Sequence, residues 1–395
     1  MKKNIMVIFG GKSTEHDISI LSSLQAIDAF DKQKYDIYPV YITKQSRWLY
    51  GEKLKKIETF RNFNYKNLKQ VAILPCSDML FIKKFGKFVP YKKIDCAFII
   101  MHGMNGEDGT LQGLLELSNI PYSSSGILAS SVGLDKIAQK QMFESLKIPI
   151  VPYLTMSKTE YEKLGKKIKL DGMSFPVVVK PNRLGSSIGI SFCKNNKQLF
   201  KALELAFKFD DFVVIEKAIK KLKEINISVL GYKDDIKLSV TEQPLTNHEL
   251  LTFTDKYCSG KNGGKIKKAP QKMECDCEEE KSNLSGGIKN GMQSLSRIVP
   301  AKIDTETNNL VQKYAKEIFI GLKCKGVIRI DFMYDETKKV LYVNEINTIP
   351  GSLAYYLWEY KGISFSDELD YIVDIALEEH KEKNKNTFVF NGNVI

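Results

Sequence analysis

Long uninterrupted hydrophobic runs are missing from this sequence of 395 residues. No window of about 18 apolar residues occurs, so no transmembrane helix is expected. The apolar run after the first two lysines is too short for the core of a secretory signal peptide, and it turns polar at once. We therefore expect a cytoplasmic protein without a membrane partner. The length favours two or three domains.

Paired cysteine motifs are also absent. The seven cysteines are scattered along the chain, and none forms a CxxC pair. In a cytosolic protein such cysteines are expected to be reduced thiols. Cys275 and Cys277 flank Asp276, but no cysteine or histidine lies at the spacing of a zinc site. A thiolate-bound metal is therefore not expected there.

Arginine-rich helices and aromatic–basic RNA motifs are lacking as well, although the net charge is +12. The lysines are spread along the chain, which is more typical of a solvated surface than of a nucleic-acid interface. No nucleic-acid partner is expected, and an anionic small substrate fits the charge equally well.

The first strand is not followed by a dinucleotide-binding fingerprint. It ends at Gly10-Gly11, but the GxGxxG spacing of that fingerprint is absent. A dinucleotide-binding oxidoreductase therefore has no support beyond the two glycines. The segment that follows predicts an amphipathic helix capped by Ser13 or Thr14.

Short apolar runs indicate an α/β region at the start of the chain. Residues 4–9, 35–42 and 96–101 predict strands, with a helix after the first of them. This order is typical of a domain built on a parallel sheet. A break at Pro121 indicates a domain boundary.

A lysine follows a buried strand directly into a glycine–serine loop. Residues 177–192 read VVVKPNRLGSSIGISF, with Lys180 at the end of the strand and Gly185, Ser186 and Ser187 in the loop. Backbone N–H groups in such a loop and a nearby ammonium can cover an anion. A plain β-hairpin with a flexible turn explains these residues alone equally well.

Residues 326–351 predict an antiparallel hairpin that carries charged side chains. Side chains alternate between the faces of a strand, so Arg329 and Asp331 share a face, as do Glu345 and Asn347. A turn near residue 338 then puts Asp331 opposite Glu345. Two carboxylates, an amide and a guanidinium are expected on one surface.

Carboxylates within apolar strands carry a large desolvation cost unless they are compensated. Oxygen ligands favour Mg²⁺ or Mn²⁺, and an arginine beside the ion can hold a phosphate or a developing oxyanion. A solvated hairpin face with salt bridges is the alternative. It fits less well, because Arg329 and Asp331 lie within an apolar run.

The strand that ends at Glu216-Lys217 places polar groups beside the apolar pair Ala218-Ile219. Such a hinge suits a purine ring, with backbone groups and Glu216 reading its edge. A surface Glu–Lys pair explains these residues, taken alone, at least as well.

The ordered set of motifs resembles the D-alanine–D-alanine ligases of the ATP-grasp superfamily, from about residue 5 to 375. The segments that carry the resemblance are FGGKSTEHDIS, HGMNGEDGTLQGLLELSNIPYSSSGILASSVGLDK, VVVKPNRLGSSIGIS, IEKAI, RIDFMY and NEINTIPG. No single motif would be specific, but their order is.

The resemblance implies an α/β ATP-grasp fold that is α+β in its C-terminal half. It implies an N-terminal domain over 1–121, a central lid domain over 122–213, and a C-terminal domain over 214–395 with a long mobile loop at 251–298. ATP would lie between the last two domains. The implied reaction joins two D-alanines through an acyl phosphate, with ATP and two Mg²⁺ or Mn²⁺ ions. A homodimer in peptidoglycan synthesis is also implied.

The resemblance assigns roles residue by residue. The implied catalytic residues are Glu15, Ser186, Tyr257, Arg329 and Gly351. Those implied near the amino-acid substrates are His102, Tyr356 and Leu357. The implied ATP-binding residues are Lys136, Lys180, Glu216, Lys217, Ile219, Glu224 and Lys256. The implied metal ligands are Asp331, Glu345 and Asn347.

Two departures from the family pattern stand out. Lys256-Tyr257 matches the mobile loop, but the Pro-Ala that usually follows closely comes only at Pro300-Ala301. Tyr356 stands where many members carry a serine that holds the acceptor carboxylate. The second substrate therefore stays open among D-alanine, D-serine and D-lactate, as does a related ligase for another amino acid.

Overall fold

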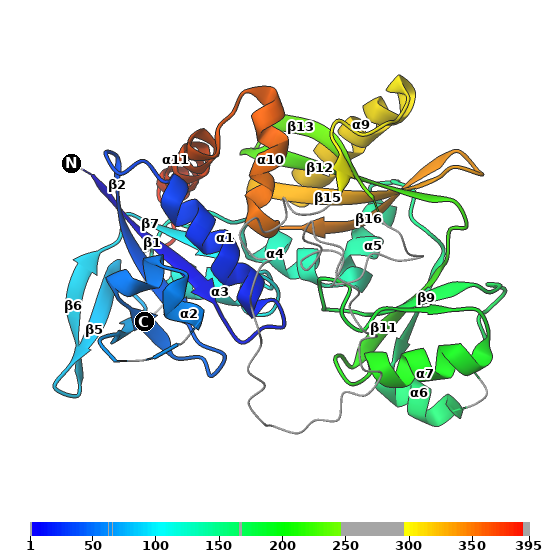
Figure 1. Cartoon of the computed structure of the whole chain (residues 1–395), viewed down its shortest axis with the longest axis horizontal. Coiled ribbons are helices and arrows are strands. Elements are labelled where there is room, and N and C mark those ends of the chain that lie inside the picture. Colours follow the sequence, from blue (N-terminus) through cyan, green and yellow to red (C-terminus); the bar gives the residue numbers. More distant parts are fainter. Residues whose placement is uncertain (1, 62, 65, 166–167, 246–295, 390–395) are drawn as a thin grey trace.

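Three β-sheets with their helices make up the protein (Figure 1). The computed structural model describes residues 2–61, 63–64, 66–165, 168–245 and 296–389. In Figure 1 the first sheet lies at the left, the last at the upper right and the middle one at the lower right. Within the described residues, no helix is long and apolar enough to cross a membrane.

The first sheet has seven strands in the order β6-β5-β4-β3-β2-β1-β7. β1, β2 and β7 are parallel, as the apolar runs predict, and the other four strands extend the sheet with antiparallel pairs. The elements are β1 (Lys3–Gly10), α1 (His16–Ala29), β2 (Tyr35–Ile42), β3 (Trp48–Tyr50), η1 (Glu52–Lys55), α2 (Glu58–Arg61), β4 (Lys69–Ile73), β5 (Met79–Lys84), β6 (Lys87–Lys93), β7 (Cys96–Ile100) and α3 (Thr110–Leu117).

The start of α1 differs from the prediction. The helix begins at His16 with Glu15 at its N-cap, and no side chain caps it. Ser13 Oγ instead accepts a hydrogen bond from the Glu15 N–H at 3.1 Å. The expected cap at Ser13 or Thr14 was wrong because the N-cap position falls on Glu15. The Glu15 carboxylate does not cap the helix and instead accepts a hydrogen bond from Ser186.

The middle sheet is small and antiparallel, in the order β10-β9-β11-β8. The predicted hairpin at 177–192 forms, since Ser191 pairs with Val179. The expected boundary between 213 and 214 falls inside β11. The elements are β8 (Tyr153–Ser157), α6 (Lys158–Leu164), β9 (Val177–Pro181), β10 (Ser191–Cys193), α7 (Asn196–Ala206) and β11 (Phe212–Lys217).

The last sheet is antiparallel, in the order β14-β13-β12-β15-β16, and it confirms the α+β character of the C-terminal half. Its strands are β12 (Leu222–Tyr232), β13 (Asp235–Pro244), β14 (Arg297–Ile298), β15 (Lys325–Asp335) and β16 (Val340–Asn347). The helices of this part are α9 (Thr305–Gly321), η4 (Gly351–Ala354), α10 (Tyr355–Trp358), η5 (Glu359–Lys361) and α11 (Phe365–Lys383).

Two regions contribute to the core of a sheet from which other elements separate them in the sequence. Helices α4 (Ile127–Leu134) and α5 (Lys136–Ser145) contribute Ala129 and Phe143 to the core of the last sheet. The C-terminal α11 contributes Ile372 to the core of the first sheet. The middle sheet has a separate core, so it is the part best able to move as a unit.

Removal of the Phe143 side chain tests this assignment of α5. Phe143 is fully buried, so Phe143→Ala should lower the free energy of unfolding by about 3–5 kcal/mol. Hydrogen exchange should then rise in α5, β15 and β16 and stay unchanged in β9 and β11. Leu203→Ala, in the core of the middle sheet, should give the reverse pattern. Faster exchange in β9 and β11 of the Phe143 variant would contradict the assignment.

Candidate active site

The β15–β16 hairpin brings the predicted charged residues together. Asp331 pairs with Glu345, and Arg329 pairs with Asn347, as their spacing predicts. The register then shifts, because Phe332 pairs with Val343 and leaves one extra residue, Asn344, on β16. A bulge of this kind turns two consecutive side chains toward one side. Asn344 and Glu345 therefore both line the same cavity.

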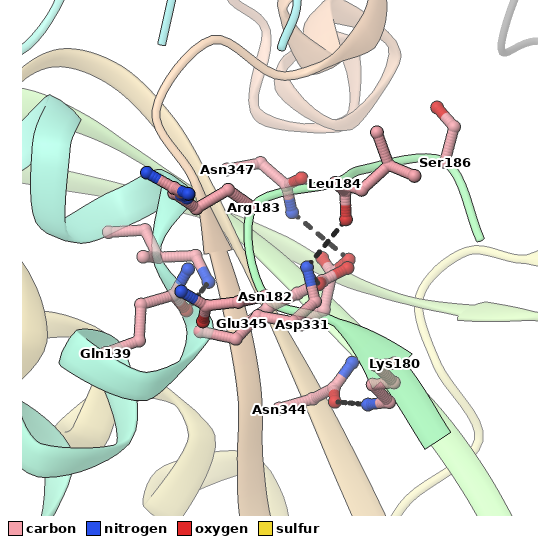
Figure 2. Close-up of polar contacts among 12 residues, drawn as sticks. Gln139, Lys180, Asn182, Arg183, Leu184, Ser186, Asp331, Asn344, Glu345 and Asn347 are labelled. Carbon is pink, nitrogen blue, oxygen red and sulfur yellow. Dashed lines mark hydrogen bonds and ion pairs between the residues drawn. The ribbon is translucent and has the colours of Figure 1, made fainter. Parts of the chain in front are cut away.

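Arg329 and Asp331 form a buried two-point ion pair. Arg329 Nε and Nη2 donate to the two Asp331 oxygens at 2.6 and 2.7 Å. Burial alone would lower the pKa of Arg329, but the Asp331 charge outweighs it and raises that pKa well above the usual value. Asn347 Nδ2 donates to Asp331 Oδ2 at 3.2 Å (Figure 2). The guanidinium is thus charged and held in one orientation by Asp331.

The donor set suits a hard divalent cation. Asp331 and Glu345 supply carboxylate oxygens, and Asn347 has an amide oxygen on the same strand pair. Asp331 Oδ2 accepts from both Arg329 and Asn347, whereas Oδ1 accepts from Arg329 alone and keeps a second lone pair with which it can act as a ligand. Among the described residues no group of three His, Cys, Asp or Glu is placed to hold a metal. A site here depends on the amide and on oxygens from outside the chain, as Mg²⁺ usually does.

Two lysines face this carboxylate surface. Lys136, at the start of α5, donates to the Leu184 carbonyl at 2.8 Å and lies 3.6 Å from Glu345. Lys180, on β9, donates to the Asn344 amide oxygen at 3.0 Å (Figure 2). Both ammonium groups line the cavity between the middle and last sheets. They provide positive charge opposite the proposed metal ligands.

Glu216 lies behind Lys180 rather than in the cavity wall. Its carboxylate is 2.7 Å from Lys140 and 2.7 Å from Lys180, and the residue is 3% exposed. Burial alone would raise the pKa of Glu216, but the two lysines outweigh it and lower this pKa to about 2. The Glu216 carboxylate was expected to bind the amino group of adenine. Such a hydrogen bond would compete with these two ion pairs.

The glycine–serine loop reaches the first domain. Ser186 Oγ donates a hydrogen bond to Glu15 Oε1, across the cavity from β16. A Cβ on Gly185 would lie 2.8 Å from Glu15 Oε2, so a larger residue here would displace the end of the Glu15 side chain. The loop from the middle sheet therefore closes against the start of α1, as expected for a lid. Both loop residues line the same cavity as Lys180.

His102 has both ring nitrogens bonded to protein atoms. The carbonyl of Ile349 can only accept, so His102 Nδ1 donates to it, at 2.9 Å. Ser22 Oγ lies 3.1 Å from Nε2 and itself accepts from the Ser352 N–H at 3.0 Å. Burial lowers the pKa of His102 to about 4. The structure thus gives this residue a positioning role between the first and last domains.

The segment after Gly351 has an unusual backbone. Ser352, Leu353 and Ala354 have φ angles of 51°, 54° and 58°. Side chains rarely adopt this left-handed conformation, so each residue adds strain that the surroundings must offset. Ser22 accepts from the Ser352 N–H, and Ser352 Oγ donates to Gln25 at 2.7 Å. Contacts from α1 therefore hold the backbone that carries the Gly351 N–H.

Tyr356 and Leu357 are buried beneath this segment. The Tyr356 hydroxyl donates to Glu242 at 3.1 Å, and the Arg297 guanidinium lies 4.0 Å from the centre of its ring. Arg297 also pairs with Glu242 at 2.7 Å. The departure at Tyr356 is therefore part of a cluster of three residues, of which sequence analysis identified only one.

Of the remaining predicted residues that the structure describes, Glu224 lines the cavity, whereas Lys217 and Ile219 do not. Lys217 turns away and donates to the Ser174 carbonyl at 2.6 Å, and Ile219 is half-buried in the loop after β11. Lys256 and Tyr257 lie outside the described residues.

Several residues of the site were missed by sequence analysis. Asn344 could not be found, because it reaches Lys180 only through a bulge that no sequence pattern marks. Glu107 accepts from the Gly103 N–H at 2.7 Å and from the Ile349 N–H at 2.9 Å. It lies in the GEDG motif that sequence analysis quoted without assigning a role. The other missed residues are Lys140, Asn226, Glu242 and Arg297.

The protonation of His102 gives a pH-dependent prediction. The folded state binds its proton only near pH 4, whereas the unfolded chain binds it near 6.5. Stability from neutral His102 is therefore full above pH 6.5 and is lost as the pH falls toward 4. His102→Gln should remove this part, so the stability difference between parent and variant should grow with pH by about 3 kcal/mol. Denaturation across this range measures it, and a constant difference would contradict the prediction.

Comparisons with known proteins show the family of this chain. The family models for the D-ala D-ala ligase N-terminus and C-terminus match residues 4–125 and residues 142–285 and 287–374. The chain is 34% identical to the D-alanine--D-alanine ligase of Thermosipho africanus, over 99% of this chain and 98% of the relative.

Solved structures of similar proteins share the arrangement. The VanG D-Ala:D-Ser ligase from Enterococcus faecalis is 28% identical, with a TM-score of 0.75 over 95% of this chain and 100% of that chain. The ligase from Bacillus anthracis complexed with ATP is 26% identical, with a TM-score of 0.64 over 96% of this chain and 99% of that one. This protein belongs to the D-alanine–D-alanine ligase family, with the ATP-grasp fold.

Proposed function

We propose that this protein joins two D-alanines at the expense of ATP, releasing ADP and phosphate. The observation that carries the proposal is the single cavity lined by Lys136, Lys180, Ser186, Asp331 and Glu345. These residues come from α5, from β9 and the loop after it, and from the β15–β16 hairpin, so the cavity lies where an ATP-grasp protein would hold the nucleotide. The curated relative from Thermosipho africanus carries the name of this activity.

The first step would transfer the γ-phosphoryl group to the carboxylate of one D-alanine. Lys136 and Lys180 would neutralise phosphate oxygens, because both ammonium groups face the cavity. Phosphoryl transfer depends mainly on positioning and on charge stabilisation, which fixed lysines supply. Mg²⁺ or Mn²⁺, as one ion or two, would be held by Asp331, Glu345 and Asn347 and would neutralise phosphate charge.

The second step would be attack of the second D-alanine amine on the acyl phosphate, followed by loss of phosphate. The developing oxyanion needs preorganised donors. Arg329 and the Gly351 N–H are proposed for this role, since Arg329 is already fixed by its two bonds to Asp331. Glu15, bonded to Ser186, would hold the ammonium of the first amino acid while the loop excludes water.

A related ligase with D-serine or D-lactate as acceptor is the second candidate. It is favoured by one observation, the burial of Tyr356 with Arg297 and Glu242 at the expected acceptor position. The Enterococcus faecalis structure, named a D-Ala:D-Ser ligase, has a similar fold. The activity is proposed to act in the cytoplasm, in peptidoglycan synthesis, and in a homodimer. Phosphate release with ATP, Mg²⁺ and each acceptor, with product mass, decides between the candidates.

Loss of a metal ligand tests the proposed cation site. Glu345→Ala should lower turnover by at least about 100-fold, because phosphate charge is no longer neutralised. Mn²⁺ affinity, measured by calorimetry with a non-hydrolysable ATP analogue, should fall in parallel while the melting temperature changes little. Glu336→Ala is the matched control, since Glu336 lies in the turn of the same hairpin and pairs with Lys223. Parent-like Mn²⁺ affinity in the Glu345 variant would rule out this ligand.

The acceptor position can be tested at Tyr356. Tyr356→Phe keeps the ring beneath Arg297 but removes the hydroxyl that binds Glu242. We expect KM for the second D-alanine to rise roughly tenfold, with KM for the first unchanged, because a buried bond to a charged group is lost. Tyr355→Phe is the control, since the Tyr355 ring stacks on Phe365 instead. Equal effects on both substrates would remove Tyr356 from the acceptor position.

A further inference from the structure

Three buried ions form a chain behind the cavity wall. Lys140 and Lys180 each lie 2.7 Å from one oxygen of Glu216. Lys140 is 1% exposed, Glu216 is 3% exposed and Lys180 is 7% exposed. Lys140 does not line the cavity, whereas Lys180 does. Lys140 is therefore connected to the cavity through Glu216 and Lys180, although it does not line the cavity itself.

The sheet explains why Glu216 approaches Lys180. Glu216 pairs with Val178 across β11 and β9, and Lys180 is two residues further along β9 on the same face. Their side chains are thus diagonal neighbours, within reach of each other. Lys140 comes from α5, one helical turn after Lys136. Two lysines of one helix face accordingly serve different places: Lys136 faces the cavity and Lys140 faces Glu216.

The charge of this group decides what Lys180 can do. Two ammonium groups and one carboxylate leave a net charge of one positive unit. Without Lys140, the Glu216–Lys180 pair would be neutral. Glu216 would then neutralise most of the Lys180 charge within the protein. A buried ion needs a partner, and in a low dielectric this interaction is strong. With Lys140 present, Glu216 is already balanced.

We propose that Lys140 is a positioning residue whose charge offsets Glu216 and keeps the Lys180 ammonium available for the phosphates of the nucleotide. This inference rests on the nucleotide site proposed above. Lys140 acts through Glu216 and Lys180, and it touches no substrate. Its second contact is a cation–π interaction, since its ammonium lies 5.1 Å from the centre of the Tyr153 ring.

Calorimetric binding of ATP and of adenosine, at one Mg²⁺ concentration, tests the proposal. The readout is the affinity for ATP divided by the affinity for adenosine. Adenosine makes the base and ribose contacts without the phosphates, so this ratio reports the contribution of the phosphates. Lys140→Met should lower this ratio by on the order of tenfold. Lys140→Arg keeps the charge and should restore it. A purely structural role would lower stability and weaken both ligands equally.

Variants of Glu216 separate charge from packing. The double variant Lys140→Met/Glu216→Gln returns the group to one positive charge, so its ratio should recover toward that of the parent. Glu216→Gln alone leaves two positive charges and should raise the ratio, which keeps the proposal testable should Lys140→Met fail to fold. An unchanged or lower ratio in Glu216→Gln, or an unchanged ratio in Lys140→Met, would overturn it. Failure of the parent to bind ATP would instead refute the nucleotide site.

Discussion

The site depends on how buried charges are balanced along one strand pair. β15 and β16 place two carboxylates and the Asn344 amide at a cavity, with the Arg329 guanidinium buried beside Asp331, so each ion has lost much of its hydration. Arg329 offsets Asp331, and Lys136 lies beside Glu345. Each pair is satisfied within the protein, so the site can be assembled before any ligand arrives. A ligand then exchanges one ionic partner for another instead of stripping water from an isolated charge.

The same constraint links the three sheets. Lys180 lies on the middle sheet. One of its partners, Glu216, lies on the same sheet, and the other, Asn344, lies on the last sheet. Ser186, in the loop after β9, donates a hydrogen bond to Glu15 at the N-cap of α1 and so connects the middle sheet with the first domain. Because the middle sheet has its own hydrophobic core, it can move as a body while these polar contacts are exchanged. The lid is therefore attached to the rest of the site through hydrogen bonds and ion pairs.

The first and last domains are joined by packing, by hydrogen bonds and by ion pairs such as Lys383 with Glu116 and Lys34 with Asp370. α11 shares the core of the first sheet, and His102 and Glu107 bind the two sides of the Ile349 peptide. Those contacts lie beside the left-handed backbone at Ser352–Ala354. Strained backbone persists where its surroundings over-determine it. This rigid junction gives the Gly351 N–H a fixed place, in contrast to the mobile character expected of the lid.

Local rules were enough for much of this protein. Alternation of side chains along a strand predicted that Asp331 faces Glu345, and apolar runs predicted β1, β2, β7 and the 177–192 hairpin. The same rules could not place Asn344, since a bulge changes which side a residue faces. They could not pair Lys140 with Glu216 or Arg297 with Tyr356 either, because those partners are distant in sequence. Periodicity reports which side of one element is buried, whereas the partner of a buried charge is decided only when separate elements pack.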